Sequence, residues 1–241
     1  MSKLFSEAEK IILNKFNEGK EIEFEKETWK IEKKGKPRPN DERGECKTDI
    51  FLEISKLNKN RQIKISLKLE NYEFLENKIN KSRALQILGP DALKIISTAS
   101  KNIKGKFIKS LESQSLSAQN KFTLGWKIEI FKDTKRKLAA ELNLNSSQKI
   151  DILSGSNLTE EKKNGKISNE IIKDSGVPNY ILVIPPSEDR ITKLSPSKIL
   201  NSLQPIDKYC NEIKINAGFT ALNYRLDEDK WDGNRPLAVS V

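Results

Sequence analysis

The stretch from Glu45 to Lys68, ECKTDIFLEISKLNKNRQIKISLK, predicts a β-hairpin around which the rest of the chain is organised. Apolar side chains alternate with other residues on both sides of a polar turn at residues 58–60, as in half-buried strands. A turn at residues 58–59 would align the apolar positions on one face, which then points at a core: Ile50, Leu52, Ile54, Ile63, Ile65 and Leu67. The same register predicts Asp49 beside Lys68 at the open end, with Cβ atoms about 5 Å apart.

Taken alone, Asp49 and Lys68 fit a cross-strand ion pair on a solvent-facing sheet as well as a functional pair. Their spacing, however, resembles the PD-(D/E)xK nuclease superfamily, which includes most type II restriction endonucleases. Thr48-Asp49 stands where that pattern has Pro-Asp, and Ser66-Leu67-Lys68 stands where it has acidic-x-Lys. The resemblance covers about residues 44–80. It implies an α/β fold with a restriction-endonuclease-like mixed central β-sheet flanked by helices.

The resemblance also implies an activity, the Mg²⁺-dependent hydrolysis of phosphodiester bonds in double-stranded DNA, and a set of site residues. The expected catalytic residues are Asp49, Ser66, Lys68 and Glu76. Asp49 would be a metal ligand together with the main-chain carbonyl of Leu67, and Lys68 would orient or polarise the attacking water. Ser66 lacks the usual carboxylate, so a glutamate must come from elsewhere. We expect Glu76 first and Glu73 next, on a helix at residues 71–81, with Glu45 contributing from the loop before the strand.

Composition limits the chemistry that this chain can perform. It has 241 residues, a formal net charge of +10 and no histidine. The positive charge indicates a polyanionic partner such as nucleic acid, although a compositional bias toward Lys, Ile and Asn also produces it. The lack of histidine excludes Ser-His-Asp, Cys-His and HEXXH sites, so hydrolysis would need carboxylates, lysine and a hard cation. Cys46 and Cys210 do not form a zinc motif, while a disulfide between them stays open.

Two basic clusters are candidate DNA contacts, and a solvated loop is the alternative for each. The first lies before the predicted catalytic strand and the second follows a strand predicted at residues 121–131: Lys34, Lys36, Arg38, then Lys132, Lys135, Arg136 and Lys137. A helix is predicted from Glu7 to Asn17, capped by Ser6. Glu7 and Glu9 fall in its first turn, and we interpret them through the helix dipole and solvent exposure, although this helix lends a glutamate in some members of the superfamily.

The chain is predicted to be one nuclease domain over residues 1–241 with insertions. Its catalytic core spans about residues 1–140, and residues 141–241 complete the sheet and contact DNA or a dimer partner. A homodimer is expected, because symmetric sites suit symmetric proteins. No signal peptide or apolar run of about 18 residues is present, which predicts a cytoplasmic protein without a membrane partner. Two alternatives stay open: a non-catalytic nucleic-acid-binding protein of the same fold, and a phage or repair nuclease without sequence specificity.

Overall fold

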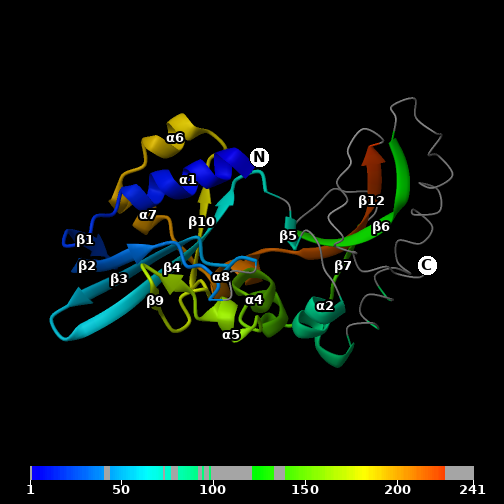
Figure 1. Cartoon of the computed structure of the whole chain (residues 1–241), viewed down its shortest axis with the longest axis horizontal. Coiled ribbons are helices and arrows are strands. Elements are labelled where there is room, and N and C mark those ends of the chain that lie inside the picture. Colours follow the sequence, from blue (N-terminus) through cyan, green and yellow to red (C-terminus); the bar gives the residue numbers. More distant parts are fainter. Residues whose placement is uncertain are drawn as a thin grey trace. The chain divides into compact units, whose positions relative to one another are not determined.

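The chain has a mixed α/β fold in which a curled mixed sheet is flanked by helices, as the sequence predicts at this level (Figure 1). The computed structural model describes residues 2–40, 44–72, 74–76, 81–91, 94, 98, 121–132 and 139–225. By its contacts the chain divides into two compact units, residues 1–72 with 153–212 and residues 73–152 with 213–241. No helix in these described ranges is long and apolar enough to cross a membrane.

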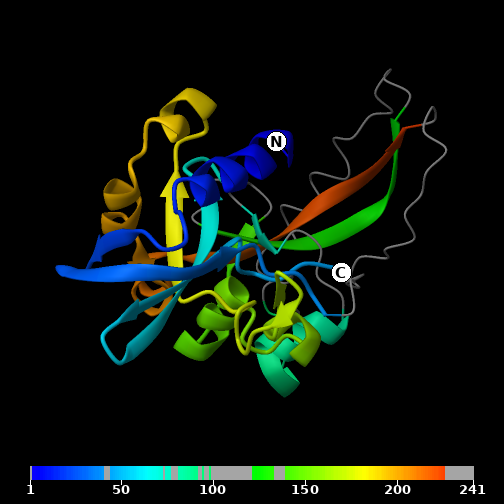
Figure 2. The ribbon, with the colours of Figure 1, turned by 60° about the vertical axis from the view of Figure 1, so that its left-hand side comes forward.

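The first unit is built on a six-stranded sheet in the order β1-β2-β3-β4-β10-β11. Its strands are β1 (Glu21–Phe24), β2 (Glu27–Gly35), β3 (Ile50–Lys56), β4 (Lys59–Leu69), β10 (Tyr180–Ile184) and β11 (Gln204–Pro205). Neighbouring strands are antiparallel except for β4 and β10, which run parallel side by side (Figure 2). The predicted hairpin therefore lies inside the sheet and not at its edge.

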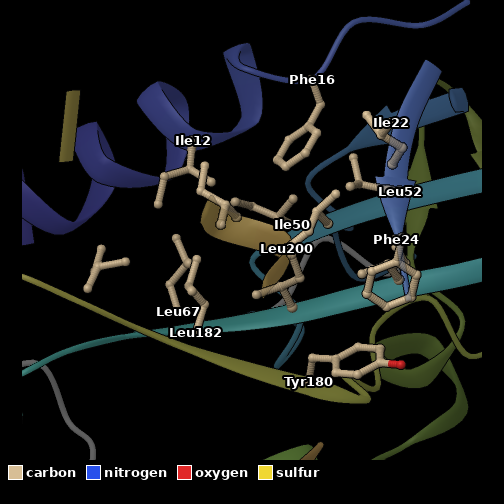
Figure 3. Close-up of a cluster of buried hydrophobic side chains, with 14 of the residues drawn as sticks. Ile12, Phe16, Ile22, Phe24, Ile50, Leu52, Leu67, Tyr180, Leu182 and Leu200 are labelled. Atoms are coloured by element: carbon tan, nitrogen blue, oxygen red, sulfur yellow. The ribbon is translucent and has the colours of Figure 1, made fainter. Parts of the chain in front are cut away.

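Helices cover one face of this sheet. They are α1 (Ser2–Asn14), α6 (Glu188–Thr192) and α7 (Pro196–Asn201), while α8 (Ile206–Glu212) follows β11 (Figure 1). Figure 3 shows Ile12 of α1 and Phe16, which follows the helix, facing the apolar residues of the sheet, which include Ile50, Leu52, Leu67 and Leu182. α1 begins at Ser2, so the prediction of a start after Ser6 is wrong. Glu9 consequently lies in the middle of the helix and not in its first turn.

The opposite face of the sheet is also covered, which corrects the expectation that it faces solvent. Phe51 and Ser66, predicted on that face, are buried, as is their neighbour Ile181 in β10. The covering segment contains α5 (Glu160–Lys163) and the small hairpin of β8 (Lys166–Ile167) and β9 (Glu170–Ile171). Ile167 packs so closely on the sheet that a Cβ atom at Gly35 would lie 2.5 Å from its Cγ2 atom.

The hairpin register differs by two residues from the predicted one. β3 and β4 pair Ile50 with Ile65 and Leu52 with Ile63, around a turn at Leu57 and Asn58. A shift of two residues keeps every side chain on the same face, so the apolar pattern cannot distinguish the two registers. The choice of turn decides between them. Leu57 is 95% exposed and has a φ of 50°, a left-handed conformation that Asn adopts more readily than Leu.

The second unit contains α2 (Lys81–Leu88), the 3-10 helix η1 (Gly89–Asp91) and most of α4 (Ser146–Ser154). Its antiparallel sheet has the order β5-β6-β12-β7, with β5 (Phe74–Glu76), β6 (Lys121–Lys132), β7 (Ala139–Glu141) and β12 (Ile215–Arg225). The predicted strand at residues 121–131 is confirmed. The predicted helix at residues 71–81 is wrong, because β5 pairs with β6 within this range.

Candidate functional site

Asp49 is held in place by main-chain hydrogen bonds directly before β3. Its N–H donates to the carbonyl of Ile65 at 2.9 Å, and its Oδ2 accepts from the N–H of Leu67 at 2.7 Å. The N–H groups of Lys47 and Thr48 both donate to the carbonyl of Gly176, at 3.1 and 3.2 Å. The backbone and the carboxylate of Asp49 are therefore fixed from β4 and from the segment that covers the second face of the sheet.

The surroundings of Asp49 disfavour its negative charge. Burial raises the pKa of its carboxyl group to about 7, and the negative charge of Glu9 acts in the same direction. The positive charge of Lys68, the hydrogen bond from Leu67 and the charge of Lys36 lower this pKa without offsetting the burial. A bound cation would favour the ionised form of Asp49, because an opposite charge nearby stabilises a carboxylate.

Glu9 is the residue that the sequence interpretation missed. It is buried in α1, and its Oε2 atom lies 2.5 Å from the Nζ atom of Lys36. A signal for it was present in the sequence, because Phe5, Glu9, Ile12 and Phe16 follow the spacing of one helix face. A glutamate inside an apolar stripe is expensive to bury unless it has a partner, so its position indicates a role beyond the helix dipole.

A cavity of about 960 Å³ joins these groups. Its walls come from α1, the loop after β2, the residues before β3 and the β8–β9 hairpin. Three carboxylates and four cationic side chains line it: Glu9, Glu45, Asp49, Lys10, Lys36, Arg38 and Lys166. The cavity thus combines carboxylate oxygens with a basic lining, and this arrangement suits an anionic ligand that carries a cation with it.

Ser66 and Lys68 lie in β4. The two-residue shift means that Lys68 is not directly opposite Asp49 as predicted, although its charge still acts on that carboxylate. The Nζ atom of Lys68 lies 5.8 Å from the ring centroid of Tyr72. Ser66 is 1% exposed, and its hydroxyl has no hydrogen-bond partner among the described residues. A carboxylate at this position would lose its hydration, which gives a physical reason for the departure from the acidic pattern.

The remaining predicted site residues lie in different parts of the chain. Glu45, Lys36 and Arg38 line the cavity with Asp49, whereas Lys34 donates from Nζ to the carbonyl of Leu13 at 3.2 Å. Lys132 lies in β6 and Glu76 in β5, both in the second unit. The side chain of Glu76 lies outside the described residues, as do four complete residues: Glu73, Lys135, Arg136 and Lys137.

The oxygen donors of the cavity fit a magnesium ion better than a soft metal. In the part of the chain that the structure describes, no cluster of three or more Asp, Glu, Cys or His side chains could hold a metal. Mg²⁺ does not need such a cluster, because it usually binds through one or two carboxylates, with waters and a substrate phosphate. Asp49 and Glu9 could supply these carboxylates. Cys46 and Cys210 are both buried free thiols.

A comparison of the chain with protein-family models, with curated proteins and with solved structures finds no match.

Proposed function

We propose that this chain is a Mg²⁺-dependent endonuclease that hydrolyses phosphodiester bonds of double-stranded DNA, of the PD-(D/E)xK type and most simply a type II restriction endonuclease. One observation carries the proposal. The Asp49 carboxylate accepts a hydrogen bond from the N–H of Leu67 and shares a cavity with the buried carboxylate of Glu9. The positive charge of Lys68 stabilises its ionised form. This is the donor set that metal-assisted phosphodiester hydrolysis needs in a chain without histidine.

Each residue has a distinct role in this proposal. Asp49 and Glu9 hold the metal, and Glu9 replaces Glu76 as the preferred second ligand. When bound, Mg²⁺ supplies Lewis acidity and lowers the pKa of the attacking water. Lys68 orients that water and offsets negative charge at the scissile phosphate. Lys36 balances the charge of Glu9 through their ion pair at 2.5 Å, so two carboxylates can share a partly buried site.

The strand order supports the finer assignment of a restriction-endonuclease-like fold. A helix precedes a meander of β2, β3 and β4, and β10 adds in parallel beside β4. The proposed ligands come from α1 and from the start of β3, and the lysine comes from β4. A homodimer is part of the proposal, because a symmetric recognition site would be bound by two copies.

A second candidate function is a nucleic-acid-binding protein on the same fold without hydrolytic activity. The residue at the usual acidic position favours this alternative, because Ser66 is buried and offers no carboxylate to a metal. A nuclease without sequence specificity is the third candidate. All three use the basic lining of the cavity, so they differ in chemistry and selectivity and not in the class of ligand.

Incubation of the protein with supercoiled plasmid DNA distinguishes the three functions. With Mg²⁺, discrete fragments support a restriction endonuclease and a smear supports a non-specific nuclease, and EDTA should abolish either. An Asp49→Asn variant purified in the same way controls for contaminating nucleases. A gel-mobility shift without cleavage, in Mg²⁺ and in Mn²⁺, would contradict the proposed hydrolysis and favour the binding protein.

A further inference from the structure

The β8–β9 hairpin contributes residues to the wall of the cavity that contains Asp49. Its turn consists of Ser168 and Asn169, with φ angles of 48° and 69°. Two consecutive residues of this kind form the tight turn that matches the twist of a two-stranded ribbon. Both residues are exposed, and both line the cavity that contains Asp49. The turn therefore presents two short polar side chains beside the proposed catalytic centre.

The hairpin is fixed to the sheet on several sides. Lys166 exchanges two main-chain hydrogen bonds with Arg38, at 2.7 and 3.1 Å. Ile167 is buried against Gly35, and Glu170 forms an ion pair with Lys33. β8 and β9 have two residues each and are joined by a two-residue turn, so few backbone torsion angles of the hairpin can vary. Recognition is most selective where adaptable side chains stand on a rigid support, because less conformational entropy is lost on binding.

Charge identifies the kind of partner. The side chains of Lys166 and Arg38 are exposed, and both line the cavity. Cationic side chains of this kind bind phosphates and set the register of a protein on DNA, whereas Asn and Ser read the donors and acceptors of base edges. The major groove of DNA is wide enough to admit a two-stranded ribbon. A rigid ribbon with a polar turn and cationic flanks matches this groove.

We propose that the β8–β9 hairpin determines sequence preference, with Ser168 and Asn169 contacting base edges next to the scissile phosphate. This inference rests on the proposed function, and it identifies which residues of that site would recognise the sequence. Lys166 and Arg38 contribute phosphate contacts, which strengthen binding to all sequences alike.

A library of random-sequence DNA duplexes tests this inference. Wild type and an Asn169→Gly, Ser168→Gly double variant are compared by sequencing both the cleaved duplexes and those retained by the protein. Glycine adopts positive φ without strain, so the turn survives while its side chains are lost. The matched control is Asn58→Gly, because Asn58 is exposed in the turn of the β3–β4 hairpin, at the end of β3 remote from Asp49.

The double variant should lose about 10- to 100-fold of the discrimination between preferred and disfavoured sequences, and the control should keep the wild-type profile. An unchanged profile in the double variant overturns the inference and leaves the nuclease proposal intact. A wild type without preference in either assay also overturns it. A wild type that binds preferred sequences without cutting them contradicts only the proposed nuclease activity. The sequence preferences of the retained duplexes, compared between wild type and double variant, then test the inference. If the double variant changes the oligomeric state measured by light scattering but keeps the wild-type sequence preference, the hairpin contacts a second copy of the chain. That result would also overturn the inference.

Discussion

Two carboxylate–cation pairs in this chain differ in how completely they are enclosed. In the second unit, the Asp151 side chain is fully buried, and Arg83 donates to its Oδ2 at 3.0 Å and to its carbonyl at 3.1 Å. In the first unit, the Glu9 side chain is 10% exposed, while that of its partner Lys36 is 39% exposed and lines a large cavity. The Arg83–Asp151 pair is nearly enclosed, since Arg83 is only 10% exposed, whereas the Lys36–Glu9 pair borders a space that a ligand could fill.

The contrast separates a nearly enclosed charge pair from one that a ligand could reach. The buried pair of Arg83 and Asp151, with its two hydrogen bonds, joins α2 to α4. A buried carboxylate whose partner reaches into a cavity, beside a second carboxylate with a raised pKa, can exchange that partner for a ligand. Burial by itself therefore does not identify a site, whereas the access of the partner to a cavity does.

The sharpest test of the proposed site around Asp49 and Glu9 is the Asp49→Asn variant. It keeps an oxygen that can accept from the N–H of Leu67 but removes the negative charge that a metal needs. Cleavage of plasmid DNA in Mg²⁺ should fall at least about a thousandfold, equivalent to about 4 kcal/mol of activation free energy. Binding to the same DNA, measured by mobility shift, should change little. Activity within tenfold of wild type would remove Asp49 from the proposed mechanism.

The closed pair should show the opposite behaviour in an Arg83→Met variant. Loss of the guanidinium leaves Asp151 buried without its ion-pair partner, and the free energy of unfolding should fall by about 3 kcal/mol in urea titrations. Lys36→Met is the matched control. Glu9 lines the cavity, where water can hydrate its carboxylate once Lys36 is lost, so this change should lower the free energy of unfolding by less than about 1 kcal/mol. Equal losses in the two variants would mean that the difference in enclosure has no energetic meaning.

Glu9→Gln tests whether the second proposed ligand comes from α1. The amide has nearly the shape of the carboxylate, so cleavage should fall about a hundredfold through lost charge and not through lost packing. Glu76→Gln, the change favoured by the sequence alone, should leave cleavage within about threefold of wild type. The reverse order of effects would return the second ligand to Glu76, and the isothermal titration of Mg²⁺ into each variant gives an independent readout.

The smallest expected effect is a pH dependence of stability that comes from Asp49. Its pKa rises from the usual range near 4 to about 7 in the folded chain, so the folded state binds a proton that the unfolded state has lost. Stability relative to Asp49→Asn should therefore decrease as the pH rises from 4 to 7 and stay constant above. Urea titrations at pH 5 and pH 8 measure this difference, and equal values at the two pH values would contradict the raised pKa.

The sequence predicted the parts of the site that depend on local pattern. The two strands of the hairpin, with Asp49 directly before the first of them, follow from the alternation of apolar residues. It could not choose between two registers that bury the same face, since that choice depends on a left-handed leucine at the turn. The spacing of Glu9 in an apolar helix face indicated that its side chain is buried, but it could not place Glu9 near Asp49, because that proximity arises only when α1 packs on the sheet. Phe74 shows the same limit, since its pairing with Phe131 overrides a helical pattern.

The parallel pairing of β4 with β10 also has a consequence for biosynthesis. Ile65 of β4 pairs with Tyr180 of β10, which is synthesised more than a hundred residues later. The carbonyl that accepts hydrogen bonds from the residues before Asp49 belongs to Gly176. Contacts so distant in sequence form late, because a long loop has to close before they can stabilise anything. Until β10 emerges from the ribosome, the nascent chain presents β4 as an open edge that other chains can pair with. The surroundings of Asp49 are therefore completed only after most of the polypeptide has been synthesised, and a prematurely terminated chain would leave the edge of β4 unpaired.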